Sequence, residues 1–438
     1  MPYIANTPEN IQEMLARIGV KDFKELIADI PQDILLKSKL DLPPALSEME
    51  AAKEISGISK ANRPAGEMIS FLGGGAYDHY IPAAVDHILS RPEFYTAYTP
   101  YQAEVSQGTL QVIWEFQSLI AALTGMDVAN ASMYDGATAL TEAGLMACSH
   151  TKRKKLIISG TVHPEYREVL KTYCRGLNIE IAEIPWKDGV TSLEELERNI
   201  DDKTAAVLIQ HPNFLGALEP VEEMSDIAHK NGALFVVSAD PISLGILKAP
   251  GSYGADIVTG EGQPLGIPMG LGGPYLGLLA AKNPLLRLMP GRIVGLTTDN
   301  QGREGLVLTM QAREQHIRRE KASSNICSNQ ALCALAATVY MSLMGRDGIK
   351  QVAELCLQKS HYLAQNLEPA FKAPFFKEFV YKTKRPTPQV LAELKQKGII
   401  AGLDLGRFFK QLEGHLLISV TEKRTREELD LLIQALTK

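Results

Sequence analysis

Several features that mark particular classes of protein are scarce in this sequence of 438 residues. It has five cysteines and no C-x-x-C pair, so neither a zinc site nor a disulfide framework is expected. Acidic residues outnumber basic ones, 51 to 45, and the basic excess that is typical of nucleic-acid binding is missing. No apolar run approaches the roughly 18 residues of a membrane-spanning helix, and residues 1–6 do not read as a signal peptide. We expect a cytoplasmic protein with reduced thiols, which binds no metal, nucleic acid or membrane.

What is present fits a globular chain of more than one domain. Hydrophobic residues make up 45% and charged residues 22%, a balance that disordered chains do not show. The first 65 residues predict helices over 7–18, 22–28 and 47–58, the first of them capped by Thr7 and closed by Gly19. We interpret them as an N-terminal helical arm whose apolar faces need a cover.

From residue 150 onward, short apolar strands alternate with amphipathic helices. Such alternation is typical of an α/β fold with a mostly parallel sheet covered by helices on both faces. The sequence therefore predicts a large α/β domain over 66–320 and a smaller α+β domain over 321–438. The expected strands cover residues 155–159, 179–184, 205–209, 233–237, 256–258 and 275–281, and the helices between them cover 164–175, 192–199 and 221–230.

Polar side chains follow several of these strands, where functional residues of an open α/β sheet collect. His163, Asn213 and Asp240 each come directly after a strand, and Asp135 and Thr138 open an apolar helix. Singly, each is as well explained by a helix cap or a loop. Together they indicate a pyridoxal phosphate (PLP) site: a phosphate at the helix N-terminus, a histidine stacked on the ring, an asparagine at its phenolic oxygen and an aspartate at its nitrogen. Their order resembles the PLP-dependent enzymes of fold type I.

One essential residue of such a site is missing. A PLP enzyme of this kind needs a lysine well after the aspartate, because its amine forms the Schiff base with the cofactor. This sequence has no lysine between Lys248 and Lys282. The stretch 260–274 instead reads GEGQPLGIPMGLGGP, with six glycines and no amine.

At this stretch the chain resembles the lysine-less half of the glycine decarboxylase P-proteins, which many bacteria split into two homologous subunits. The partner half reads N-x-H-K-T in this loop, and alignment of the shared Ile-Pro and Gly-Gly-Pro places Gln263 where the partner has its lysine. Further segments carry the same resemblance: residues 94–108 read FYTAYTPYQAEVSQG, residues 75–82 read GAYDHYIP, and residues 313–327 read REQHIRREKASSNIC. The resemblance covers essentially the whole chain.

The resemblance implies the fold of PLP-dependent transferases (fold type I), with a seven-stranded sheet, and a role in the glycine cleavage system. The partner subunit would carry PLP. Together the two subunits would decarboxylate glycine, release CO2 and transfer the aminomethyl group to the lipoyl arm of the H-protein. An α2β2 assembly is expected, and this chain alone is expected to be inactive.

The resemblance also suggests which side chains matter. The residues expected to reach the partner's active site are Tyr95, Tyr98, Thr99, Tyr101, Gln102, Glu104 and Gln107, although some of the tyrosines could simply pack at the interface. Possible contacts to anionic groups are Arg313, His316, Arg318 and Arg319, with a solvated helix face as the competing explanation. A vestigial PLP-type pocket would contain Asp135, Thr138, His163, Asn213, Asp240 and Gln263.

Two other interpretations remain at the level of sequence. The chain could be a non-catalytic scaffold or regulatory pseudoenzyme whose pocket binds nothing. It could also bind PLP without a covalent bond, although Asp135 places an acid at the expected phosphate position and so opposes a dianion.

Overall fold

A computed structural model describes residues 5–437, with the exceptions of 39, 271, 323 and 327. Ser323 and Cys327 of the segment 313–327 therefore lie outside the described residues. The chain divides into two compact units, Met1–Arg63 and Pro64–Lys438. In the described part of the chain, no helix is both long enough and apolar enough to cross a membrane.

The first unit consists of three capped helices with much apolar surface. They are α1 (Pro8–Ile18), α2 (Phe23–Leu26) and α3 (Glu48–Lys60). Thr7 caps α1 in a capping box and Gly19 ends it in the left-handed conformation, as the sequence predicts. Many large apolar side chains of this unit are exposed, among them Ile34, Leu42 and Met49. The helices are thus specified locally, while their apolar faces are not covered from within the unit.

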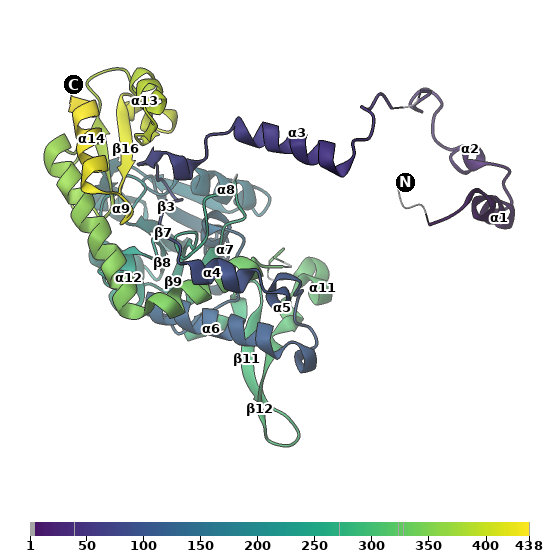
Figure 1. The fold of residues 1–438 in the computed structure, drawn as a ribbon. Coiled ribbons are helices and arrows are strands. Elements are labelled where there is room, and N and C mark those ends of the chain that lie inside the picture. Colours follow the sequence, from purple (N-terminus) through teal and green to yellow (C-terminus); the bar gives the residue numbers. More distant parts are fainter. Residues whose placement is uncertain (1–4, 39, 271, 323, 327, 438) are drawn as a thin grey trace. The chain divides into compact units, whose positions relative to one another are not determined.

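The second unit is built on a seven-stranded sheet in the order β2-β10-β9-β8-β7-β3-β4 (Figure 1). The strands from β9 to β4 are parallel, and β10 is antiparallel to both of its neighbours. This mostly parallel sheet confirms the predicted fold class. The bounds are β2 (Val128–Ala129), β3 (Lys155–Ser159), β4 (Glu180–Ile184), β7 (Thr204–His211), β8 (Leu234–Ala239), β9 (Ile257–Glu261) and β10 (Gly277–Ala281).

Both faces of this sheet are buried, which explains why its strands read as continuous apolar runs. Along β3, Ile157 belongs to one apolar cluster, whereas Leu156 and Ile158 belong to another. The first cluster includes side chains of α6 (Gln107–Thr124), α10 (Val221–Lys230) and the long helix α12 (Ala331–Leu367). The second includes side chains of α7 (Gly136–Thr151) and α8 (Pro164–Arg175). The sheet is therefore the middle layer of three.

The C-terminal part of this unit adds a smaller sheet and its helices. Helix α12 is interrupted at Gly345, whose φ of 58° is not helical. Strands β13 (Glu378–Lys382), β16 (His415–Ser419) and β15 (Leu403–Asp404) form an antiparallel sheet with α13 (Thr387–Gln396) and α14 (Arg426–Thr437). The early strand β1 (Ile69–Ser70) pairs with β14 (Ile399–Ile400), so residues near 70 are fastened to this C-terminal part.

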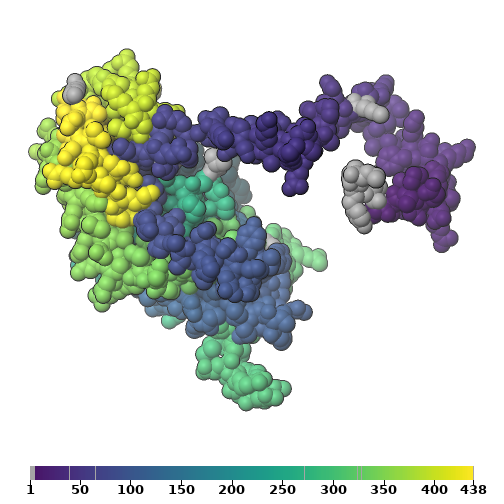
Figure 2. Space-filling view, viewed as in Figure 1, coloured from purple at the N-terminus to yellow at the C-terminus, as the bar shows by residue number. Residues whose placement is uncertain are grey.

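A two-stranded hairpin, which the sequence does not predict, projects from the body of this unit (Figures 1 and 2). It consists of β11 (Ile293–Thr298) and β12 (Glu304–Thr309), and its apolar Leu296 is exposed. It packs against α6 through Val294 and Leu306. The remaining short elements are α4 (Ala83–Leu89), α5 (Pro92–Tyr95), β5 (Trp186–Lys187), β6 (Val190–Thr191), α9 (Leu193–Asn199) and α11 (Gln315–Arg318).

A buried acid in α7 gives the fold a testable pH dependence. Glu142 accepts a hydrogen bond from the hydroxyl of Ser324 (2.8 Å), and burial raises the pKa of Glu142 to about 7 from 4.5. The folded chain therefore holds a proton that the unfolded chain has already released between these two pH values. Stability is lost as the pH rises through this window.

We expect Glu142→Gln to match the wild type in free energy of unfolding at about pH 5 and to exceed it by about 2 kcal/mol at about pH 8. Denaturant unfolding at both pH values measures this difference, and other titrating groups cancel in the comparison. Glu142→Ala, which also loses the bond to Ser324, should be destabilised at both pH values. Equal pH dependence of the wild type and Glu142→Gln would contradict the expectation.

Candidate functional site

A narrow cavity, here called the central pocket, lies at the carboxyl ends of the parallel strands. It has about 30 Å³ of free volume, which is room for a water molecule or two. Residues that follow β7, β8 and β9 meet there with the loop at Gly75 and the start of β13. The polar side chains that line it belong to Tyr77, Tyr166, Gln210, Ser238, Asp240, Glu261, Lys377 and Glu378.

The sequence-predicted Asp240 lies in the central pocket and forms an ion pair with a lysine that the sequence does not single out. The Lys377 Nζ is 2.7 Å from Asp240 Oδ2; the lysine side chain is buried, and that of Asp240 is 12% exposed. The same ammonium lies 3.5 Å from the centre of the Tyr77 ring, a cation–π contact. Asp240 Oδ1 accepts from the backbone N–H of Ile242, which fixes the carboxylate at the strand end. Asp240 is therefore satisfied entirely from within the chain.

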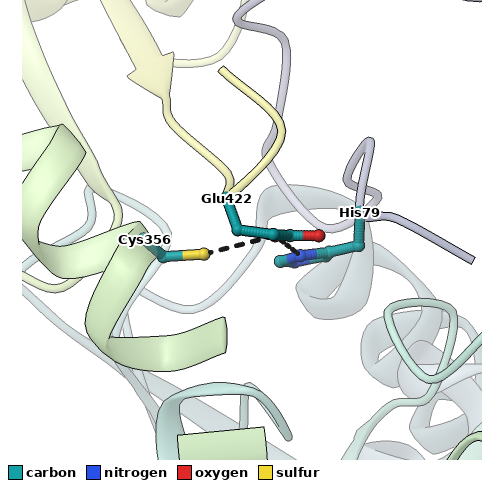
Figure 3. A group of neighbouring side chains, drawn as sticks. All are labelled: His79, Cys356 and Glu422. Atoms are coloured by element: carbon teal, nitrogen blue, oxygen red, sulfur yellow. Dashed lines mark hydrogen bonds and ion pairs between the residues drawn. The ribbon is translucent and has the colours of Figure 1, made fainter. Parts of the chain in front are cut away.

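Behind Lys377 lies a buried hydrogen-bonded cluster of His79, Cys356 and Glu422 (Figure 3). His79 Nε2 lies 3.1 Å from Lys377 Nζ, and His79 Nδ1 lies 2.6 Å from Glu422 Oε2. Because an ammonium only donates, Nε2 must accept, and Nδ1 carries the proton. Burial lowers the pKa of His79, and the Lys377 charge lowers it further, so the ring is neutral.

Glu422 is the anion of this cluster. Burial raises its pKa, but the hydrogen bonds from His79 and from the Tyr80 N–H outweigh that effect and hold the pKa at about 2. The cluster could be taken for a metal site from its residue types alone. Both nitrogens of His79 are already engaged, however, and a cation would meet the ammonium of Lys377. We interpret the cluster as the support of Lys377.

Glu378 fastens the glycine loop to the start of β13. Its carboxyl accepts from the Gly74 N–H and from the Tyr77 hydroxyl, both at 2.8 Å. Burial raises the pKa of Glu378 to about 7, while the neighbouring Lys377 acts in the opposite direction. Position 73 requires glycine for a steric reason, because a Cβ there would lie 2.3 Å from the Glu378 carboxyl. The loop thus approaches β13 more closely than other residues allow.

The N-terminus of α7 is occupied by an acid, though not by the one that the sequence suggests. Asp135 turns back onto its own helix, where it and Thr138 form a capping box. The acid that reaches the first turn is Glu261, at the end of β9. Its Oε2 accepts from the Gly136 N–H, and its Oε1 accepts from the N–H groups of Gln263 and Leu276, each at 3.0 Å. Burial raises the pKa of Glu261 to about 7 against the lowering effect of these three donors.

Gln263 lies next to Glu261 and cross-links two loops with its amide. Its Oε1 accepts from the Tyr77 N–H at 2.8 Å, while its Nε2 donates to the carbonyls of Tyr77 and Ile267. The acceptor and both amide hydrogens are therefore used. Gln263 is almost fully buried, and it has a structural task at the position where the resemblance expects the partner's lysine.

Two other predicted pocket residues have local tasks. His163 caps α8 by accepting from the Glu165 N–H, donates to the Gly74 carbonyl, and stacks on Tyr166 with ring centroids 4.7 Å apart. It borders the pocket through Tyr166. Asn213 does not face the pocket: its Nδ2 donates to Gly189 and Glu219, and its Oδ1 accepts from two backbone N–H groups. The expected contact of Asn213 with a ring oxygen therefore has no free group to make it.

The tyrosine segment lies apart from the pocket residues and is open to solvent. Tyr98 is 82% exposed and Tyr95 69%, and Tyr101 is half-exposed. The neighbouring Gln102 and Glu104 are also exposed, and Thr99 is partly buried. Gln107 has a different task, because its side chain pairs with the backbone of Leu306 at the base of the β11–β12 hairpin. The exposed phenols form a surface, here called the tyrosine surface, defined by Tyr95, Tyr98 and Tyr101.

The four candidate anion contacts do not act as one cluster. The guanidinium of Arg313 donates to the carbonyls of Met289 and Gly291, so it holds a loop. The His316 ring packs against the Tyr101 ring in a T-shaped arrangement, with 6.2 Å between centroids, and thus adjoins the tyrosine surface. Arg318 and Arg319 are exposed. Sequence reasoning missed Arg292, a buried residue whose guanidinium lies 5.8 Å from the centre of the Tyr101 ring.

Comparison with known proteins places this architecture in a family. The model of the family described as glycine cleavage system P-protein matches residues 1–436. A protein of Carboxydothermus hydrogenoformans, named probable glycine dehydrogenase (decarboxylating) subunit 1, is 56% identical and covers 100% of this chain and 99% of its own length. A protein of the same name from Geobacillus kaustophilus is 53% identical over 99% of this chain and 98% of its own.

Solved structures agree with this placement. A crystal structure of glycine decarboxylase (P-protein) in an inhibitor-bound form matches with a TM-score of 0.89 and 42% identity, covering 100% of this chain and 99% of that one. A NifS-like protein matches with a TM-score of 0.62 at 14% identity, over 84% of this chain and 98% of its own, which shows the fold alone. The fold is that of fold type I PLP-dependent proteins, as the resemblance implies.

The amide of Gln263 provides a test of the cross-link between the two loops. We expect Gln263→Ala to lower the free energy of unfolding by about 2 to 4 kcal/mol, because three buried backbone groups lose their partner. Gln389→Ala, at an exposed position of α13, should change it by less than about 0.5 kcal/mol. Denaturant unfolding measures both variants, and equal small losses would contradict the cross-link.

Proposed function

The chain belongs to the glycine cleavage system P-protein family, and on that premise we propose that it works as the PLP-free subunit of a two-subunit glycine dehydrogenase (decarboxylating). Its partner is the homologous subunit that carries PLP. Together they decarboxylate glycine, release CO2 and pass the aminomethyl group to the lipoyl arm of the H-protein. The assembly is α2β2 and cytoplasmic.

The central pocket carries this proposal, because its residues do not fit PLP. Position 263 holds a glutamine whose amide is fully engaged, so it offers no amine to the cofactor. Asp240 is already paired with Lys377. About 30 Å³ of free volume is far smaller than the roughly 300 Å³ and more of ordinary ligand pockets. No step of the reaction is therefore placed in this pocket.

The contribution of this chain is to complete the partner's active site with the tyrosine surface. Three phenols on one exposed segment combine apolar rings with hydroxyl groups, a composition that suits a partly wet cleft between subunits. Arg292 and His316 both contact the Tyr101 ring. The tyrosines can thus orient a small substrate and exclude water without taking part in covalent chemistry.

The exposed Arg318 and Arg319 come two and three residues after His316, whose ring contacts Tyr101 of the tyrosine surface. Two guanidinium groups near a catalytic cleft suit the attraction of an acidic carrier such as the H-protein or of the glycine carboxylate. Arg313 belongs to the support of this region, because its guanidinium bonds to backbone carbonyls.

The competing function is that of a scaffold or regulatory pseudoenzyme, which the closed central pocket would also suit. Reconstitution decides between the two. We expect glycine-dependent CO2 release in the presence of H-protein only when both subunits are mixed. The readout is CO2 from carboxyl-labelled glycine, with each subunit alone as the control. Full activity from the PLP-carrying subunit alone would contradict a catalytic need for this chain.

The tyrosine surface yields a sharper prediction. The triple variant Tyr95→Phe, Tyr98→Phe and Tyr101→Phe keeps the rings and removes the hydroxyls. It should assemble normally but release CO2 at least about tenfold more slowly. Tyr362→Phe removes a hydroxyl that bonds Asp430 in the C-terminal part and serves as the matched control. A wild-type rate for the assembled triple variant would show that these phenols only pack.

A further inference from the structure

We infer that this chain excludes PLP actively, with two of its own charged side chains that take the places of the cofactor's charges: Glu261 at the N-terminus of α7 and Lys377 beside Asp240. The inference rests on the proposed function, in which this subunit works without PLP. The inference goes beyond that function, because the missing lysine is then only one of three obstacles to PLP binding.

The first obstacle is at the anionic end of the pocket. The first turn of a helix attracts negative groups through its free N–H groups and its dipole, and this is where phosphates bind in many folds. In this chain the Glu261 carboxylate already accepts from the Gly136 N–H, and it gathers the Gln263 and Leu276 N–H groups as well. A phosphate would have to displace this acid from three donors and then remain beside its charge.

The second obstacle is at the cationic end. An aspartate in the position of Asp240 serves PLP enzymes by pairing with the protonated ring nitrogen. Here the Lys377 ammonium holds that carboxylate at 2.7 Å and is itself supported by His79 and by the Tyr77 ring. A ring nitrogen carrying a proton would face an ammonium rather than a free carboxylate.

Sequence reasoning singled out neither of the two substituting groups. Glu261 ends β9, two residues before Gln263, and Lys377 directly precedes β13 in the C-terminal part. Each of these two side chains has a full set of partners. Removing one member of a buried ion pair lowers the stability of the fold far more than the pair itself raises it. The two side chains therefore occupy the two ends of the pocket as a fixed part of the fold, without help from a cofactor.

The inference predicts how strongly a series of variants should bind PLP. Restoring an amine by Gln263→Lys should not by itself let the chain bind PLP, since both charged groups remain. The double variant Glu261→Ala with Lys377→Ala should bind PLP at least tenfold more tightly than the wild type, even without that amine. Adding Gln263→Lys to the double variant should make the adduct reducible by borohydride.

The measurement is equilibrium dialysis of the full chain against PLP, followed by borohydride treatment and intact mass. Dialysis against pyridoxal, which lacks the phosphate, tests the Lys377 end of the pocket separately. Dialysis against inorganic phosphate tests the Glu261 end. The matched control is Glu142→Ala with Lys282→Ala, which removes a buried acid and a lysine paired with Asp256, both outside the pocket. It should bind no more PLP than the wild type.

Stoichiometric PLP on Gln263→Lys alone would overturn the inference and leave the proposed function intact, because the native chain would still lack the cofactor. PLP bound by the wild-type chain would overturn both. Since the double variant could fail to fold, the wild type supplies a second measurement. Hydrogen exchange of peptides that contain Gly136 and Gln263 should be unchanged by added phosphate or PLP, and increased protection there would also overturn the inference.

Discussion

The buried ammonium of Lys377 is the charge around which the second unit is arranged. A buried charge is tolerated only where partners replace the water that it has lost. Lys377 finds them in Asp240 at the end of β8 and in His79 of the loop after the glycines. His79 in turn donates a hydrogen bond to Glu422, just after β16. One cation thus joins the large sheet, the glycine loop and the C-terminal sheet beside the narrow central pocket.

Much of the fold could be predicted from the sequence because its signals are local. The strand 155–159 and the helices 164–175 and 221–230 have the predicted ends, since apolar runs, proline at the first turn and capping residues lie next to one another in the chain. The β11–β12 hairpin could not be predicted in the same way. Its register depends on packing of Val294 and Leu306 against α6, which is distant in sequence.

The same contrast between local signals and long-range packing holds for the residues of the candidate site. Asp240 could be located by its place after a strand and Gln263 by the family resemblance, and both lie in or beside the central pocket. Their partners could not be located, because Lys377 and Glu261 carry no motif and meet the pocket only through tertiary structure. Asp135 is the instructive difference: a local rule, the capping box, takes its carboxylate away from the position that the comparison with PLP sites suggests. Asn213 is engaged by its own turn for a similar reason.

The contacts of Glu261 also bear on whether the folding stability of this chain depends on a cofactor. Cofactor-dependent chains often mature only when their vitamin is at hand, and linkage makes their stability follow its supply. A chain whose helix N-terminus is already neutralised by its own carboxylate has no such dependence. On the proposed function, the stability of this chain would therefore not follow the supply of vitamin B6, and its abundance would not depend on that vitamin.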